Sequence, residues 1–412
     1  MTLHAFEGVG LEIEYALVDR ASLDVAPIAD RVLQALSGAA RPVNDYLNGE
    51  LGWSNELVMH VLELKNVAPS ARFDPLARML QDEVRAMNTA LERFGARLMP
   101  GGMHPWMDPA KETRLWPHDH AHVYRAYDSV FGCRSHGWAN LQSTHVNLPF
   151  ANDGEFARLH AALRVIVPIL PALTAASPYA DGRAPGPLDF RMEAYRTNAD
   201  AVPQLNGQIV PEPVMTRADY QRDVLEPIYR AIVPHDPDGI LQEDWINARG
   251  VIARFERNAL EIRVVDTQEA PGVDLALAAF VLDLAQSLYE RECSNPTLDI
   301  QLPTRVLAEI FLRCVHDAER ARIDSSEFLS LFGLTRATCP AADLWSAIAE
   351  RLERENAPHA GVWRRAVEFV VTRGPLARRL LRAIGPRPDR RALHELYSAL
   401  CDALHEGRQF DP

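Results

Sequence analysis

Several features that would place a protein in a class at once are missing from this 412-residue sequence. It has no unbroken apolar run of about 18 residues, the length that a membrane-spanning helix requires. The first residues are neither basic nor apolar, so we expect no signal peptide and no membrane association. The five cysteines form no Cys-x-x-Cys pair. They therefore predict reduced thiols, a cytoplasmic location and no structural zinc site.

The glycine-rich loops that usually hold nucleotides are also missing. There is no Gly-x-x-x-x-Gly-Lys-[Ser/Thr] sequence and no Gly-x-Gly-x-x-Gly after a predicted strand, which argues against P-loop and Rossmann binding. The net charge of −13 argues against nucleic acid as a partner. It does not argue against a nucleotide, because metal ions can bridge carboxylates to phosphates.

The composition, 47% hydrophobic and 24% charged, is that of an ordinary globular protein. Short predicted strands are separated by helices of unequal length, and acidic residues recur on strand faces. This pattern indicates an α+β fold with a mainly antiparallel sheet of about six strands. We expect a catalytic domain over residues 1–300. Residues 301–412 should form a helical C-terminal region packed on the same core.

Two glutamates, Glu12 and Glu14, lie on the first predicted strand (residues 7–18). Apolar residues alternate with them, so both carboxylates share one strand face, about 7 Å apart. Like charges this close are unfavourable unless a positive charge lies beside them. A divalent cation, Mg²⁺ or Mn²⁺, is the natural candidate. A solvated strand face without a ligand is the alternative.

A second acidic pair, Glu56 and Glu63, lies in the segment from Asn55 to Lys65. Glu63 stands within a strongly apolar run, where a carboxylate needs a cation or hydrogen-bond donors. An ion pair between Glu63 and Lys65, or with an arginine, would satisfy it equally well.

A third predicted strand places His145 and Asn147 on one face, so an imidazole lies beside an amide. His145 is either a metal ligand or a structural histidine with satisfied hydrogen bonds. A fourth strand places Glu261 and Arg263 on one face, with Arg254 shortly before them. They form either an internal ion pair or a metal ligand beside phosphate-binding guanidinium groups.

If these four faces meet in one sheet, they form a polar funnel that binds several divalent ions, with arginines for phosphate. Such a site suits phosphoryl transfer, in which positioning and charge neutralisation do most of the work. The irregular segment 178–215 is long enough to be a lid or a binding loop. We expect Arg191 and Arg196 in this segment to contact substrate, at the carboxylate of an acceptor. An ordinary surface arginine is the alternative for each.

At this point the chain resembles a known family, the carboxylate–amine ligases of the glutamate–cysteine ligase type 2 group. The motifs that carry the resemblance fall in roughly residues 8–290 and are Gly10-Leu-Glu-Ile-Glu14, Glu56 with Glu63, Pro100-Gly-Gly-Met-His-Pro105, His145-x-Asn147 and Leu260-Glu-Ile-Arg-Val-Val-Asp266. The resemblance implies a glutamine-synthetase-like catalytic fold, a curved, mainly antiparallel sheet with helices packed outside. It also implies the use of ATP with two or three Mg²⁺ ions.

By the same resemblance, one metal would be held by Glu14, Glu56 and Glu63, and another by Glu12, His145 and Glu261. Arg263 would face the transferred phosphoryl group, with Arg254 and Asn147 also at the ATP phosphates, and Glu63 and Glu261 would share the catalytic role.

The implied reaction converts a carboxylate, that of the glutamate side chain above all, to an acyl phosphate, which cysteine or another amine attacks to give an amide. The partners would be small amino acids or amines and ATP, and a homo-oligomer is left open. Two alternatives remain at this point: a phosphotransferase of the same fold, and a nucleotide-binding protein without turnover.

Overall fold

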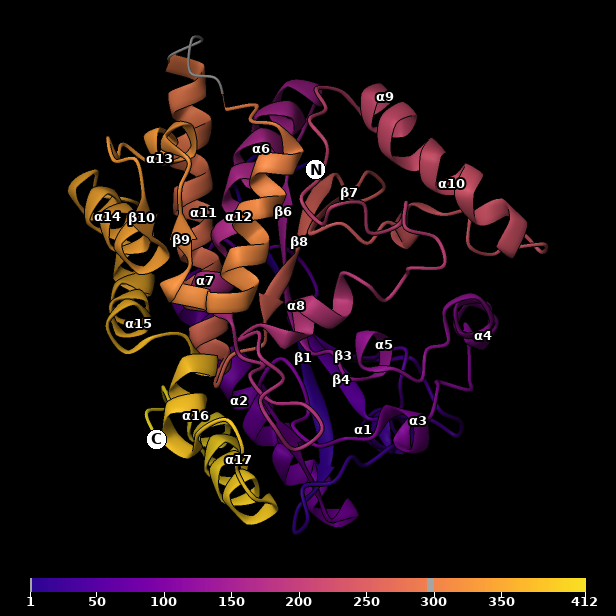
Figure 1. Cartoon of the computed structure of the whole chain (residues 1–412). Coiled ribbons are helices and arrows are strands. Elements are labelled where there is room, and N and C mark those ends of the chain that lie inside the picture. The colour runs from indigo at the N-terminus through magenta and orange to yellow at the C-terminus, as the bar shows by residue number, and fades with distance from the viewer. Residues whose placement is uncertain (1, 295–299) are drawn as a thin grey trace.

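A single antiparallel sheet of eight strands forms the centre of the protein (Figure 1). The computed structural model describes residues 2–294 and 300–412. The strand order is β2-β3-β4-β1-β6-β8-β7, and β5 pairs with the last residues of β1. The strands are β1 (Gly10–Asp19), β2 (Asp45–Asn48), β3 (Leu51–Asn55), β4 (Val61–Asn66), β5 (Ala96–Met99), β6 (Ser143–Pro149), β7 (Val251–Arg254) and β8 (Ala259–Asp266).

The α+β class with an antiparallel sheet is confirmed. The sheet has more strands than the expected six because β2 and β5, of four residues each, also join it. A separate pair of two-residue strands, β9 (Arg322–Ile323) and β10 (Cys339–Pro340), lies among the C-terminal helices.

The two faces of β1 differ as the alternation predicts. Its apolar residues Leu11, Ile13, Tyr15 and Leu17 are fully buried in the hydrophobic core. Removing such side chains from water is the main source of stability here, at about 1.5–3 kcal/mol for each. Glu12 and Glu14 therefore lie on the opposite face, which the core helices do not cover.

Helices cover the apolar face of the sheet. The long helix α11 (Pro271–Ser294) contacts α2 (Phe73–Leu91) and α6 (Asp153–Ile166), and α14 (Ala341–Arg354) and α15 (Ala360–Arg373) pack on α11 (Figure 1). Within the described residues, α11 alone is long and apolar enough to cross a membrane. Because 78% of its most apolar stretch is buried inside the protein, α11 is a core helix, and its apolar composition follows from that position.

The chain from residue 304 onward is mostly helical, as predicted. One hydrophobic cluster contains Val9 and Leu11 from the first strand region and Trp345, Trp363 and Leu404 from the C-terminal part. The two parts of the chain thus share a core. Besides α14 and α15, this part contains α12 (Thr304–Asp317), α13 (Ser326–Leu331), α16 (Leu376–Ile384) and α17 (Arg390–Glu406).

Short helices and connecting segments flank the polar face of the sheet. They include the segment 178–215, which is irregular as predicted except for one short helix, α8 (Phe190–Tyr195). The remaining helices are α1 (Ala29–Ser37), α3 (Pro109–Glu112), α4 (Ala121–Phe131), α5 (His136–Ala139), α7 (Pro171–Thr174), α9 (Arg217–Tyr220) and α10 (Glu226–Ile232).

Candidate active site

The strand registers bring the acidic residues of separate motifs together on the polar face. Glu14 lies directly opposite Glu63 of β4, and Glu12 lies between Lys65 of β4 and His145 of β6. Asn147 of β6 lies opposite Glu261 of β8. Directly opposed residues on an antiparallel pair have Cβ atoms about 5 Å apart. The four predicted strand faces therefore form one site.

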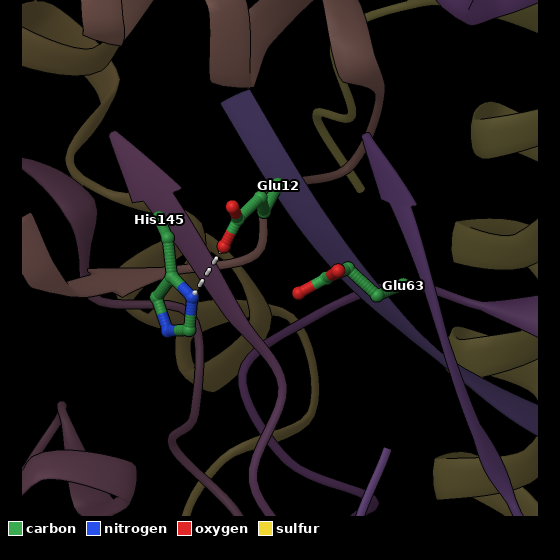
Figure 2. A group of neighbouring side chains, drawn as sticks. All are labelled: Glu12, Glu63 and His145. Atoms are coloured by element: carbon green, nitrogen blue, oxygen red, sulfur yellow. Dashed lines mark hydrogen bonds and ion pairs between the residues drawn. The ribbon is translucent and has the colours of Figure 1, made fainter. Parts of the chain in front are cut away.

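Two groups of three side chains are arranged so that one ligand atom from each lies within 4.8 Å of the others. The first group is Glu12, Glu63 and His145, and Figure 2 shows their side chains directed toward one another from β1, β4 and β6. The second group is Glu14, Glu56 and Glu63, the set predicted for one metal. Glu63 is shared by both groups, so we call the five residues the acid cluster. Carboxylate oxygens with a single imidazole suit Mg²⁺ or Mn²⁺.

Electrostatics within the acid cluster show that its negative charge is not balanced by nearby cations alone. Burial, reinforced by the charges of Glu14 and Glu63, raises the pKa of Glu56 well above its ordinary value. Burial, and next the charge of Glu12, raises the pKa of Glu63 to about 7. Carboxylates in this state gain strongly from a cation placed between them.

Glu12 and His145 balance each other. Burial alone would raise the pKa of Glu12, but its hydrogen bond with His145 and the charge of that ring lower it to about 2. The His145 Nδ1 lies 3.3 Å from the Glu12 Oε2. Burial alone would lower the pKa of the His145 ring, but the hydrogen bond with Glu12 helps to raise it above its ordinary value. His145 Nε2 lies 3.0 Å from the Ser143 hydroxyl, which in turn donates to Glu14 at 3.1 Å.

Both ion pairs that the sequence left open as alternatives are formed. Lys65 Nζ lies 3.2 Å from Glu63 Oε1, which also accepts a hydrogen bond from Ser54 Oγ at 2.9 Å. Arg263 Nε lies 2.9 Å from Glu261 Oε1. These pairs do not exclude a metal at Glu63, because both contacts use the same oxygen and leave Oε2 for another ligand.

Glu261 is held more tightly than Glu63. Arg254 donates to its Oε2 at 3.3 Å while Arg263 pairs with its Oε1, and the side chain is 2% exposed. His145 Nδ1 is 4.0 Å from Oε1. Among the described residues, Glu261 belongs to neither group of metal ligands. Its role as a ligand therefore stays a prediction, whereas its contact with Arg263 is plain.

A β-bulge adds a residue to the site that the alternation of β8 does not predict. Thr144 pairs with Val265 and Val146 with Ile262, so two residues of β8 lie opposite His145 alone. The bulge changes the parity of β8, and Asp266 becomes the partner of Ser143 on the polar face. The buried Asp266 accepts a hydrogen bond from Arg191 Nε, and its other oxygen accepts from Ala176 N and Ser177 Oγ, both at 2.7 Å.

A cavity of about 280 Å³ lies at one side of the acid cluster. Its polar lining includes Glu14, Glu56, His145, Arg191 and Arg263. Its other walls are largely apolar, with the aromatic side chains of Tyr124, Tyr127, Trp138, Tyr195 and Trp245. We call it the aromatic cavity.

A second cavity, of about 570 Å³, lies at the other side of the acid cluster. Its lining includes Glu12, Lys65, Asn147 and, from the turn between β7 and β8, Arg257 and Asn258. We call it the hairpin cavity. Gly10 faces Asn147 across the strands, and an added Cβ there would lie only 3.0 Å from the Asn147 Cβ. The Asn147 Oδ1 is buried without a hydrogen-bond partner among the described residues.

Comparisons with known proteins agree with this geometry. The model of glutamate–cysteine ligase family 2 matches residues 8–399. The chain belongs to glutamate–cysteine ligase family 2. It is therefore an ATP-dependent ligase, as the resemblance of the motifs implied, and the match extends through the C-terminal helices.

Two relatives and one solved structure illustrate what this chain is similar to. An uncharacterised protein of Archaeoglobus fulgidus is 33% identical over 73% of this chain and 77% of its own. A Rubrobacter xylanophilus protein, named "Putative glutamate–cysteine ligase 2-3", is 29% identical over 70% and 72%. The structure of a glutamate–cysteine ligase from Francisella tularensis in complex with AMP covers 96% of this chain and 88% of its own, with a TM-score of 0.59 and 13% identity. At that identity the likeness shows the fold alone.

The structure brings most of the predicted residues of this family 2 ligase to one site, but not all of them. The acid cluster, Arg263 and Arg191 line or adjoin the aromatic cavity, and Asn147 lines the hairpin cavity. Arg196 instead pairs with Glu193 at 2.5 Å. Neither Arg196 nor Arg254 is among the described residues that line the two cavities. Their contacts with substrate or phosphate stay predictions.

Three sets of residues in the ligase were missed by sequence reasoning. Arg257, whose guanidinium lies 3.7 Å from Glu12 Oε1, reaches the hairpin cavity where Arg254 does not. Asp266 was quoted only as part of a motif, without a role. The aromatic wall was missed although Tyr124 and Tyr127, three residues apart, mark one face of α4.

Proposed function

We propose that this ligase uses Mg·ATP to phosphorylate the side-chain carboxylate of glutamate and then joins the resulting acyl group to an amine. The observation that carries the proposal is the position of the acid cluster between two cavities. Glu12 lines the hairpin cavity, and its hydrogen-bond partner His145 lines the aromatic cavity. A nucleotide in the first cavity and a carboxylate in the second would thus meet at the cluster.

The donor set fits the divalent metal that the family implies. Four carboxylates and one imidazole converge from three strands and the β3–β4 connection, and the raised pKa values of Glu56 and Glu63 mark a shortage of positive charge. Glu14, Glu56 and Glu63 would hold one ion and Glu12, Glu63 and His145 a second. Bound Mg²⁺ or Mn²⁺, two or three ions, would supply charge neutralisation for the phosphates.

The remaining groups orient the reactants. Arg263, fixed by Glu261, would stabilise charge that develops on the transferred phosphoryl group. Lys65, Arg257 and Asn147 line the hairpin cavity and would contact the nucleotide. Arg191, fixed by Asp266, would bind the α-carboxylate of glutamate in the aromatic cavity. A cytoplasmic location is part of this proposal.

The reaction would proceed in two balanced steps. An oxygen of the substrate carboxylate attacks the γ-phosphorus of ATP, the bond to the β-phosphate oxygen breaks, and ADP leaves. The amine nitrogen then attacks the acyl carbon, the carbon–oxygen bond to phosphate breaks, and phosphate departs with the proton of the amine.

The test is to incubate the protein with ATP, Mg²⁺, L-glutamate and a panel of amines that includes cysteine, and to quantify ADP, phosphate and amide. We expect the three products in equal amounts. A phosphorylated product without free phosphate would indicate a phosphotransferase. ATP binding without turnover would indicate a protein that only binds nucleotide.

Glu12→Gln tests the metal role directly, with Glu395→Gln as a matched control. The control removes the same charge from an exposed side chain on α17, paired only with Arg391 within one helix. We expect Glu12→Gln to lower kcat/KM by about 100-fold or more, and Glu395→Gln to change it little. Unimpaired activity of Glu12→Gln would refute the assignment of Glu12 to metal binding.

A further inference from the structure

The aromatic cavity contains few cations for a site that must accept two organic substrates. Among the described residues that line it, Arg191 and Arg263 are the only lysine or arginine side chains. Each is already paired, Arg191 with Asp266 and Arg263 with Glu261. The carboxyl groups of Glu14 and Glu56, which the proposed function assigns to metal binding, belong to the same lining.

Glutamate as the donor would use both arginines. Its reacting carboxylate belongs beside Arg263 and the acid cluster, and its α-carboxylate belongs at Arg191. A second substrate with its own carboxylate would find no further cationic side chain in the lining. It would be buried without a cationic side chain as its partner, and a carboxylate in that position is strongly disfavoured.

The rest of the lining has a different chemistry. Tyr127 lies at the centre of an aromatic group, with ring centroids 5.1 Å from Trp138 and 5.8 Å from Trp245. Tyr124 and Tyr195 extend this wall, and Leu57, Val58 and Ile246 complete an apolar surface. Such walls bind flat or branched apolar groups.

From this division of charge we infer that the amine acceptor is a primary amine without a carboxylate and with an apolar, preferably aromatic, body. The inference rests on the proposed ligase function and extends it to the second substrate. In the second step the neutral amine nitrogen bonds to the acyl carbon while its aromatic body lies against the Tyr127–Trp245 wall. Phosphate leaves with the proton of the amine, so no further reactant is required.

The experiment compares amines with the amino acids that share their side chains. The full-length protein with ATP, Mg²⁺ and L-glutamate is supplied with phenethylamine or L-phenylalanine, 3-methylbutylamine or L-leucine, and cysteamine or L-cysteine. We expect kcat/KM for amide formation to be about tenfold or more higher for each amine than for its amino acid, and highest for phenethylamine. Higher values for the amino acids would overturn the inference.

Hydroxylamine separates failure of this inference from failure of the proposed function, because it traps an acyl phosphate as a hydroxamate whatever the shape of the acceptor pocket. Glutamate hydroxamate without an amide from any of the three amines would overturn the inference and keep the ligase chemistry. No hydroxamate with glutamate would refute the proposed function, and the inference would fall with it.

A variant of the wall tests its part in selectivity. Trp245→Ala removes a partly buried ring whose indole nitrogen has no hydrogen-bond partner among the described residues, and Trp245→Phe keeps an aromatic surface. We expect the ratio of kcat/KM for phenethylamine to that for cysteamine to fall about tenfold in Trp245→Ala and to recover in Trp245→Phe. An unchanged ratio in Trp245→Ala and in Tyr127→Leu would overturn the assignment of the wall.

Discussion

The acid cluster and the Glu269–Arg379 pair both bury carboxylates, but they balance the negative charge differently. Glu269 and Arg379 are both fully buried and lie 2.9 Å apart, and the Phe410 carbonyl and amide complete the contact. In the acid cluster four carboxylates share one imidazole, Lys65 and the more distant guanidinium of Arg257. A matched buried ion pair stabilises the fold, whereas a surplus of buried carboxylates favours the binding of a cation from solution.

The difference predicts that losses of stability and losses of activity will occur at separate places. A buried ion pair needs both of its partners for stability, since removal of one leaves a buried charge uncompensated. Removal of a carboxylate from the acid cluster relieves repulsion in the metal-free protein and costs only function. Four substitutions or additions test this contrast.

Arg379→Met should have the largest effect, on stability. It leaves Glu269 charged and buried, so we expect the free energy of unfolding to fall by about 3–5 kcal/mol. Denaturant unfolding monitored by fluorescence measures this change. The control, Arg391→Met, removes an exposed arginine paired with Glu395 and should cost less than about 1 kcal/mol. Equal effects of the two variants would contradict the structural role of the Glu269–Arg379 pair.

Glu63→Gln should have the opposite profile. Because Glu63 belongs to both groups of metal ligands, we expect kcat/KM to fall by about 100-fold or more. The free energy of unfolding in EDTA should stay the same or rise, because the pKa of Glu63, raised to about 7 by burial and the charge of Glu12, marks a carboxylate that is unfavourable when ionised. Steady-state kinetics and denaturant unfolding test the two parts. A large loss of stability in EDTA would show that Glu63 stabilises the fold in the absence of metal, as the Glu269–Arg379 pair does.

Asp274 represents a third arrangement, a buried carboxyl with hydrogen bonds and no paired cation among the described residues. Its Oδ1 accepts from Thr144 Oγ1 at 2.6 Å and Gln268 N at 3.0 Å, and burial raises its pKa from 3.8 to about 7. Between these values the unfolded chain is ionised while the folded protein retains the proton. Stability is therefore lost as pH rises, by about 1.4 kcal/mol per unit, and levels off above about pH 7.

Asp274→Asn should remove this dependence. Relative to the wild type, the variant should gain about 1.4 kcal/mol for each pH unit between about 4 and 7. Denaturant unfolding at several pH values measures the difference, and parallel stability curves for the two proteins would show that Asp274 does not titrate in this range.

The acidic residues could be singled out from the sequence because polar and apolar residues alternate around them with the period of a strand. Glu12 and Glu14 stand out from Leu11, Ile13 and Tyr15 by the period of a strand, and Glu63 stands out from an apolar run. The arrangement of these residues into two metal groups depends on the register between strands. For that reason no local pattern shows that Glu63 joins Glu12 and His145 in one group.

Other parts of the site depend on features that no local pattern shows. The bulge in β8 brings Asp266 to the polar face against the parity of its strand. The aromatic wall is assembled from α4, α5, α8 and the segment before β7, which meet only in the folded chain. The turn between β7 and β8, with Asn258 at φ 50°, directs Arg257 rather than Arg254 to the hairpin cavity.

Addition of metal should give the smallest of the expected effects. It tests whether a cation stabilises the acid cluster, as the comparison with the Glu269–Arg379 pair predicts. If the acid cluster awaits a cation, Mn²⁺ without nucleotide should bind the folded protein and raise its free energy of unfolding, by about 1 kcal/mol at five times the Kd. Thermal unfolding with and without Mn²⁺ measures this gain. It should vanish in Glu63→Gln, which takes a ligand from both groups, and persist in Arg391→Met, whose substitution lies on an exposed helix face. A gain that survives in Glu63→Gln would place the ion elsewhere, and the surplus of negative charge at the cluster would then require another explanation.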